Sequence, residues 1–93
     1  MLHYITKIIN VEPFKIICEF NSDEIREIDF TSLVEKYKIS NPQFLGRLAD
    51  IHFFQNVKLD SYGTLIWNNE IDFCPDVLYS MSENVSEKYL VSQ

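Results

Sequence analysis

Apolar and polar residues alternate through the first third of the chain, which is the pattern of half-buried β-strands. Residues 4–11 are rich in β-branched side chains, and every second residue from Phe14 to Phe20 is apolar. Residues 21–24 have the composition of a turn, and residues 25–30 form the return strand. Because connections this short cannot cross over to a parallel neighbour, we expect three antiparallel strands.

Helix-start signals replace this alternation in the middle of the chain. Ser32 and Glu35 have the spacing of a capping box, so we expect a short helix from there to about Lys38. Asn41 and Pro42 suit the cap and the first position of a second helix. The sequence therefore predicts two short helices after the first three strands.

A second group of strands should follow one further helical turn at residues 50–54. Its expected strands are residues 56–60, 64–67 and 70–73. Asn68 and Asn69 are expected to form the tight turn before the last of these strands, because asparagine tolerates a positive φ. Pro75 suits the first position of a helix, which we expect to end near Met81.

These elements predict an α+β fold, in which a small antiparallel sheet of hairpins carries short helices packed on it. We expect about five to six strands. Residues 1–81 should form a single domain, since a chain of 93 residues builds one modest core. Residues 82–93 hold isolated apolar residues among Ser, Glu and Asn, so we expect a C-terminal tail that is frayed or forms a short helix.

The charge of the chain narrows the classes of partner. Fourteen acidic and eight basic residues give a net charge of −6, and this field repels phosphate backbones, so direct nucleic-acid binding is not expected. No segment has the features of a secretion signal or approaches membrane-spanning length. We therefore expect a cytoplasmic protein without a membrane partner, in which Cys18 and Cys74 stay reduced.

The candidate chemistry of the chain lies between residues 72 and 79. Cys74 is close in sequence to Asp72 and to a helix start, which is a setting that can activate a thiol. No histidine lies nearby in sequence to act as a base, so packing or capping is the favoured role. The two histidines of the chain lack zinc-ligand spacing, and two glycines cannot form a phosphate loop. We expect no catalytic residue, metal or cofactor.

Two further features bear on association with other molecules. Trp67 could stack on a base or a ligand, but its neighbours Leu65 and Ile66 favour a place in the core or in an interface. Residues 4–11 are long and lightly charged for an edge strand, so they could pair with a second copy of the chain. A homodimer is therefore one expectation.

The order of residues near the C-terminal end resembles a known family. The motif consists of Trp67, Asn69, Asp72, Cys74, Pro75, Asp76, Leu78 and Tyr79. It resembles the bacterial domain of unknown function 2442, and weaker similarity reaches back to about Val11. Apart from Leu78, these motif residues are our candidate interaction or structural motif.

The resemblance implies a small α+β domain of unassigned biochemistry. Some relatives also carry a helix-turn-helix DNA-binding domain, and others are encoded beside a second small protein in pairs that resemble toxin–antitoxin modules. The family usually has proline where Asn68 stands, and glycine where Glu24 and Glu70 stand. Because glutamate resists a positive φ, we expect these turns to be shifted by one residue.

Our leading hypothesis is a non-enzymatic protein-interaction module that works with a separately encoded protein partner, as the antitoxin-like member of a pair. The acidic charge, the lack of a catalytic constellation and the family resemblance all favour it. One alternative is an accessory or regulatory domain that associates with DNA only through a partner chain. Another is a small enzyme or ligand binder that uses Cys74 or Asp72.

Overall fold

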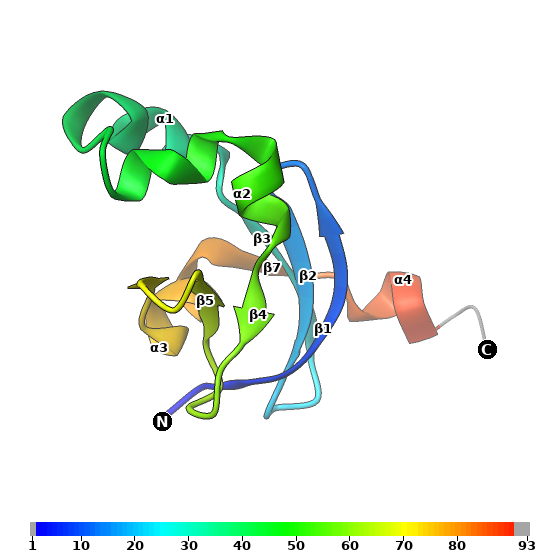
Figure 1. Cartoon of the computed structure of the whole chain (residues 1–93). Coiled ribbons are helices and arrows are strands. Elements are labelled where there is room, and N and C mark those ends of the chain that lie inside the picture. The colour runs from blue at the N-terminus through cyan, green and yellow to red at the C-terminus, as the bar shows by residue number, and fades with distance from the viewer. Residues whose placement is uncertain (1, 91–93) are drawn as a thin grey trace.

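Within residues 2–90, which the computed structural model describes, seven strands form two antiparallel sheets. The first sheet has the strand order β1-β2-β3-β7 and the second has the order β4-β5-β6 (Figure 1). The strands are β1 (Ile5–Glu12), β2 (Lys15–Phe20), β3 (Ile25–Asp29), β4 (Lys58–Leu59), β5 (Leu65–Trp67), β6 (Ile71–Asp72) and β7 (Ser82–Asn84). The α+β class and the antiparallel pairing predicted from the sequence are confirmed.

Short helices connect and cover these sheets. They are α1 (Thr31–Ser40), the 3₁₀ helix η1 (Leu45–Ala49), α2 (Ile51–Gln55), α3 (Pro75–Met81) and α4 (Ser86–Leu90). Figure 1 shows α1 and α2, which lie between β3 and β4 in chain order, gathered at one end of the molecule. In the described part of the chain, none of these helices has the length and apolar character needed to cross a membrane.

Aromatic side chains from both sheets and from α2 meet in one core. Trp67 is fully buried, and its indole Nε1 donates a hydrogen bond of 2.9 Å to the backbone oxygen of Phe54. Phe30 contacts the indole edge-to-face at a centroid distance of 5.6 Å, which is a favourable geometry for aromatic pairs. Trp67 therefore joins the second sheet to the helices and to the end of β3.

The helix boundaries show where the capping predictions hold. α1 begins at Thr31 rather than at the predicted Ser32 capping box, because Asp29 Oδ1 already accepts a hydrogen bond of 2.9 Å from the Thr31 amide. Asn41 ends α1 instead of starting a second helix, since its amide donates to the Tyr37 carbonyl. The predicted turn at residues 50–54 is present as α2.

A close contact between two backbone segments explains why η1 begins later in the sequence than the predicted helix. A Cβ on Gly46 would lie 2.8 Å from the carbonyl oxygen of Tyr37, so η1 packs against the backbone of α1 at a point where only glycine fits. The chain between Asn41 and this contact is therefore a turn, and the helix predicted to begin at Pro42 is replaced by η1 from Leu45 onward.

In the two turns that contain Glu24 and Glu70, the residues with a positive φ are the neighbours of the glutamates, as the sequence predicted. Asn68 and Asn69 have φ values of 55° and 56°, and Asp23 has a φ of 70°. Neither Glu24 nor Glu70 has a positive φ. Asparagine and aspartate therefore take the left-handed positions, as expected from the lower cost of that conformation for these side chains.

The C-terminal tail contributes a strand that the sequence pattern did not predict. β7 pairs antiparallel with β3, with Glu27 opposite Glu83 and Ile28 opposite Ser82. The short helix expected as one form of the tail is present as α4, whereas residues 91–93 lie outside the described residues. The division of the chain at residue 81 into domain and tail stays a prediction.

Replacing Trp67 by phenylalanine should lower the free energy of unfolding by about 2 kcal/mol, measured by urea denaturation. The change removes the hydrogen bond to the Phe54 carbonyl and leaves unfilled core volume. Tyr62→Phe, at a highly exposed position, is the control and should change stability by less than about 0.5 kcal/mol. A Trp67→Phe protein as stable as the original would contradict this account of the core.

Candidate interaction site

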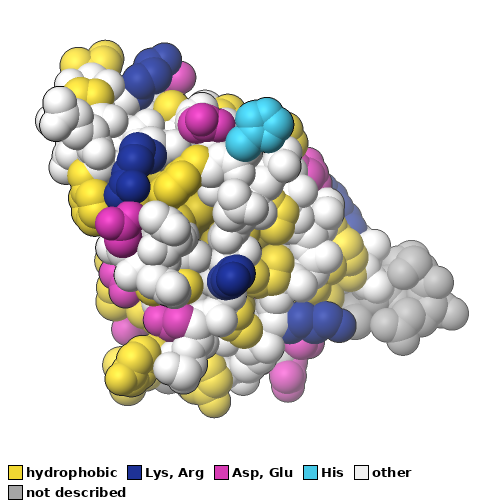
Figure 2. Space-filling model, viewed as in Figure 1, with side chains coloured by type: hydrophobic (Ala, Val, Ile, Leu, Met, Phe, Trp, Pro, Cys, Tyr) yellow, Lys and Arg dark blue, Asp and Glu magenta, His cyan; other side chains and the backbone are white. Residues whose placement is uncertain are grey.

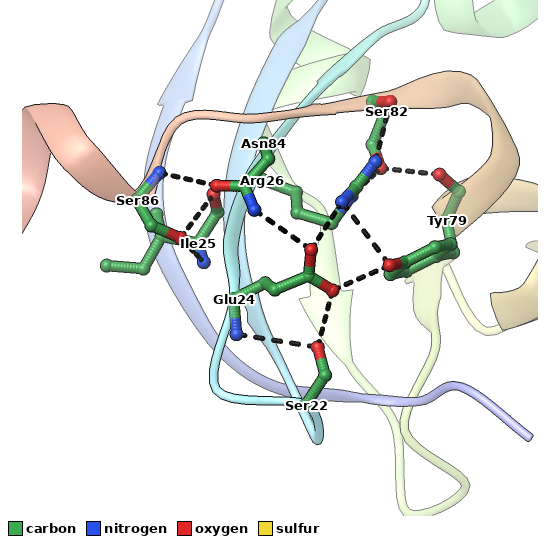
Figure 3. A network of polar contacts seen from close by, with 8 residues as sticks. All are labelled: Ser22, Glu24, Ile25, Arg26, Tyr79, Ser82, Asn84 and Ser86. Carbon is green, nitrogen blue, oxygen red and sulfur yellow. Dashed lines mark hydrogen bonds and ion pairs between the residues drawn. The ribbon is translucent and has the colours of Figure 1, made fainter.

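Tyr79 occupies the centre of a polar cluster that joins distant parts of the chain (Figure 3). Its hydroxyl donates a hydrogen bond of 2.6 Å to Oε1 of Glu24. The guanidinium carbon of Arg26 lies 4.1 Å from the centre of the Tyr79 ring, and the His3 ring stacks on it at a centroid distance of 3.7 Å. Because both groups are this close, atomic repulsion places them on opposite faces of the tyrosine.

Glu24, in the turn before β3, receives hydrogen bonds from four side chains (Figure 3). The donors are Tyr79 Oη at 2.6 Å, Ser22 Oγ at 2.7 Å, Arg26 Nη1 at 2.8 Å and Asn84 Nδ2 at 2.9 Å. The bonds from Tyr79, which is the largest contributor, from Ser22 and from Arg26 lower the pKa of Glu24 to about 2, because they favour the charged carboxylate. The same bond from Tyr79 raises the pKa of its hydroxyl.

Arg26 extends this cluster to β7. Its Nε donates to Oγ of Ser82 at 2.6 Å, and its Nη2 donates to the Ser82 carbonyl at 3.1 Å. The Ser82 hydroxyl in turn donates to the Tyr79 carbonyl at 2.6 Å. The end of α3 and the start of β7 are therefore fixed against β3 by one guanidinium.

Asp76, in the first turn of α3, attaches the N-terminal segment to the same cluster. Its Oδ1 accepts a hydrogen bond of 2.8 Å from the His3 amide, and Nδ1 of the His3 ring lies 2.8 Å from the same oxygen. These contacts, first the backbone bond and then that of the ring, lower the pKa of Asp76. The Asp76 carboxylate, which the sequence predicts at the start of this helix, therefore binds both the backbone and the ring of His3.

Asn21 holds the residues on either side of His3. Its Oδ1 accepts from the Tyr4 amide at 2.9 Å, and its Nδ2 donates to the Leu2 carbonyl at 3.2 Å. The amide of Ile5 donates to the carbonyl of Gly63 at 2.7 Å. The backbone of residues 2–5 is therefore fixed by hydrogen bonds from three different parts of the chain.

Two side chains of this fixed segment nevertheless remain exposed to water. Leu2 is 79% exposed and Tyr4 is 48% exposed, while Tyr62 at the β4–β5 turn is 85% exposed. Tyr4 and Tyr62 line one hollow of about 460 Å³, and Val77 is exposed next to Asp76. We call Leu2, Tyr4, Tyr62 and Val77 the apolar end. Hydrophobic side chains project at the end of the molecule in Figure 2 where Figure 1 places the N-terminus and the β4–β5 turn.

The structure separates the residues of the candidate motif. Trp67 is a core residue, Asn69 lies in the exposed β5–β6 turn, and Pro75 is the first residue of α3. Asp76 and Tyr79 are brought together through their contacts with His3.

Asp72 and Cys74 are exposed, at the end of β6 and at the N-cap of α3. Within residues 2–90 neither of these side chains has a hydrogen bond, and no three His, Cys, Asp or Glu side chains lie close enough to hold a metal ion. The other thiol is different, since burial raises the pKa of Cys18 to about 12. The enzyme or ligand-binding role for Cys74 and Asp72 stays a prediction.

Sequence reasoning missed His3, Glu24, Arg26 and Ser82 as members of the cluster. Glu24 and Arg26 are more than fifty residues from Tyr79, and no local pattern connects residues at such a distance. One signal was present in the sequence: Asp76 and Tyr79 are three residues apart, which places them on the same face of a helix. That spacing predicts a shared surface but not the partners on it.

The fold and this site define a small α+β domain with two antiparallel sheets and an N-terminal segment fixed to the start of α3. The chain belongs to the family described as protein of unknown function (DUF2442), whose profile matches residues 5–84. The resemblance stated from the motif is thereby confirmed at the level of the family. A comparison with curated proteins finds no match.

A solved structure with a similar fold is that of a protein from Nitrosomonas europaea named a putative DNA-binding protein. The two are 17% identical in sequence with a TM-score of 0.67, and the match covers 97% of this chain. It covers 52% of the other protein, so this chain spans about half of that protein's length. Our expectation of no direct nucleic-acid contact is contradicted by the name of this neighbour, and we withdraw it. Net charge was too coarse an argument, because it does not describe local fields.

The pKa of Glu24 predicts an acid-sensitive stability. The folded state holds this carboxyl at about 2 against an ordinary value of 4.5, so the unfolded chain binds the proton more readily. The stabilisation is present above about pH 4.5 and should be lost as the pH falls towards 2. Urea denaturation at several pH values should show a smaller loss over this range in Glu24→Gln than in the original protein.

Glu35→Gln is the matched control for this experiment. Glu35 is 65% exposed and pairs with Lys38 at 3.7 Å on the surface of α1, an arrangement that contributes little to stability. Its variant should follow the acid dependence of the original protein. If Glu24→Gln also followed that dependence, Glu24 would not be held by the cluster in solution.

Proposed function

We propose that this domain is a non-enzymatic protein-interaction module and that the apolar end is its docking surface. The observation that carries this proposal is the fixed backbone of residues 2–5, which keeps Leu2 and Tyr4 exposed beside Tyr62. Tyr4 and Tyr62 line one hollow, and exposed apolar groups of this kind are typical of protein contact sites, where tyrosine is enriched. Because the segment is already ordered, binding costs little conformational entropy.

The charges near this surface indicate the chemistry of the partner. Asp60 accepts hydrogen bonds from the amides of Tyr62 and Thr64, and Asp76 lies at the other side of the N-terminal segment. Carboxylates therefore flank the apolar groups in a chain of net charge −6. A complementary partner presents a shallow apolar pocket with lysine or arginine around it. The antitoxin-like role implied by the family resemblance is one form of this function.

Tyr62→Ser should abolish capture of a protein that the original chain retains from a lysate of the cells that make it. The substitution removes an aromatic side chain that is 85% exposed, so it should leave the fold intact. Ile39→Ser is the matched control, because Ile39 is 81% exposed on α1 and far from the apolar end in chain order. The captured protein is identified by mass spectrometry, and both variants are checked by circular dichroism.

The affinity of the purified partner for each variant then tests the proposal. Its affinity for Tyr62→Ser should be at least about tenfold weaker than for the original chain, which corresponds to about 1.4 kcal/mol. Equal affinities for the original chain and Tyr62→Ser, or a loss only in Ile39→Ser, would place the interaction elsewhere and overturn this docking surface.

A second candidate function is DNA binding, which is supported by the name of the Nitrosomonas europaea protein. It is tested by the fluorescence anisotropy of a labelled short DNA duplex, titrated with this chain at low salt. A complex should form and weaken as salt rises, because counterions are released when basic side chains meet phosphates. Unchanged anisotropy at low salt would remove this candidate.

A further inference from the structure

A second hollow lies away from the apolar end, between α2, β4 and the β5–β6 turn. Its volume is about 290 Å³, and it is lined by Phe53, Asn56, Lys58, Asn68 and Asn69. One wall is aromatic, three side chains are amides, and one is a lysine. None of these residues belongs to the Tyr79 cluster.

The walls of this hollow are fixed by hydrogen bonds behind them. Glu70 Oε2 accepts from Arg47 Nη1 at 3.1 Å and from Asn68 Nδ2 at 2.8 Å, which ties the β5–β6 turn to η1. The Trp67 indole ties β5 to α2 through the Phe54 carbonyl. The backbone around the hollow is therefore preorganised, and a ligand would order only exposed side chains of the lining.

Several polar groups of the lining have no hydrogen-bond partner within residues 2–90. They include the ammonium of Lys58 and the whole side-chain amide of Asn69. The amide nitrogen of Asn56 donates to the His52 carbonyl at 3.1 Å, and that of Asn68 donates to Glu70, so their Oδ1 atoms remain available as acceptors. The hollow thus offers one cationic donor, one amide that both donates and accepts, and two further acceptors.

This set of groups matches a nucleobase that carries a phosphate. A side-chain amide can pair with the adjacent donor and acceptor of an adenine edge. An aromatic ring such as Phe53 provides a surface for the base, and a lysine ammonium binds phosphate. Arg47, whose guanidinium lies 5.1 Å from the centre of the Phe53 ring, packs on that wall while it pairs with Glu70 at 3.1 Å.

We propose that this hollow binds an adenine mononucleotide, with the base between Phe53 and Asn69 and the phosphate at Lys58. Lys58 lines this hollow and can supply the one cation that a single phosphate needs. This binding is independent of the apolar end.

Titration of adenosine monophosphate into ¹⁵N-labelled protein tests the proposal. Amide signals of the lining residues should shift together and saturate, and the indole N–H of Trp67, the only tryptophan, should report the neighbouring contact. Asn69→Gly should weaken binding at least about tenfold. Since residue 69 has a φ of 56°, glycine keeps the turn and removes only the amide.

Lys58→Ala should weaken binding of adenosine monophosphate by a similar factor, while Lys38→Ala, which removes the same charge from α1, should leave it unchanged. Adenosine, which lacks the phosphate, should bind the original protein about as weakly as the nucleotide binds Lys58→Ala. Equal affinities for all three lysine forms, or no saturable shift at millimolar nucleotide, would overturn the proposal. A short single-stranded adenine oligomer could bind through the same residues more tightly than the mononucleotide. That result would support the proposed contacts to base and phosphate, but it would overturn the free mononucleotide as the ligand.

Discussion

The carboxylate of Glu24 is the group on which the arrangement of distant segments most depends. A domain of this size builds a core that leaves little excess stability, so long-range polar ties matter more than they would in a larger protein. Glu24 collects donors from β3, α3 and β7, and the Tyr79 ring it fixes also carries His3. Its loss would leave Arg26 without its carboxylate in a setting where that side chain is only 14% exposed.

The sequence predicted those elements whose cause is local. Alternation along residues 14–20 is enough to define β2, and the N-terminal preference of proline defines the start of α3. β7 could not be found in this way, because Ser82–Asn84 has no apolar alternation and is a strand only through its pairing with β3. The Tyr79 cluster was hidden for the same reason, since its members meet only after the sheet and α3 have formed.

The two proposed surfaces lie at opposite ends of one short segment. Tyr62 precedes β5 and Asn69 follows it, and the three residues of this strand span roughly 10 Å. β5 itself is held by Trp67 in the core, so a substitution at either end need not disturb the other. The docking surface and the nucleotide hollow are therefore two separate proposed sites on the same hairpin, and each can be tested without the other.

Charge placement limits what this domain can do with nucleic acid. Arg26 and Arg47 are both engaged with glutamates, at 2.8 Å and 3.1 Å, so each guanidinium is largely neutralised where it lies. Lys58 has no ion pair with a carboxylate within residues 2–90, and it lines the hollow together with amides that can read a base edge. Counterion release from a long duplex requires several such cations along one face. One lysine next to three asparagine amides instead favours recognition of one nucleotide, in which the base supplies the specificity and the phosphate supplies the single charge contact.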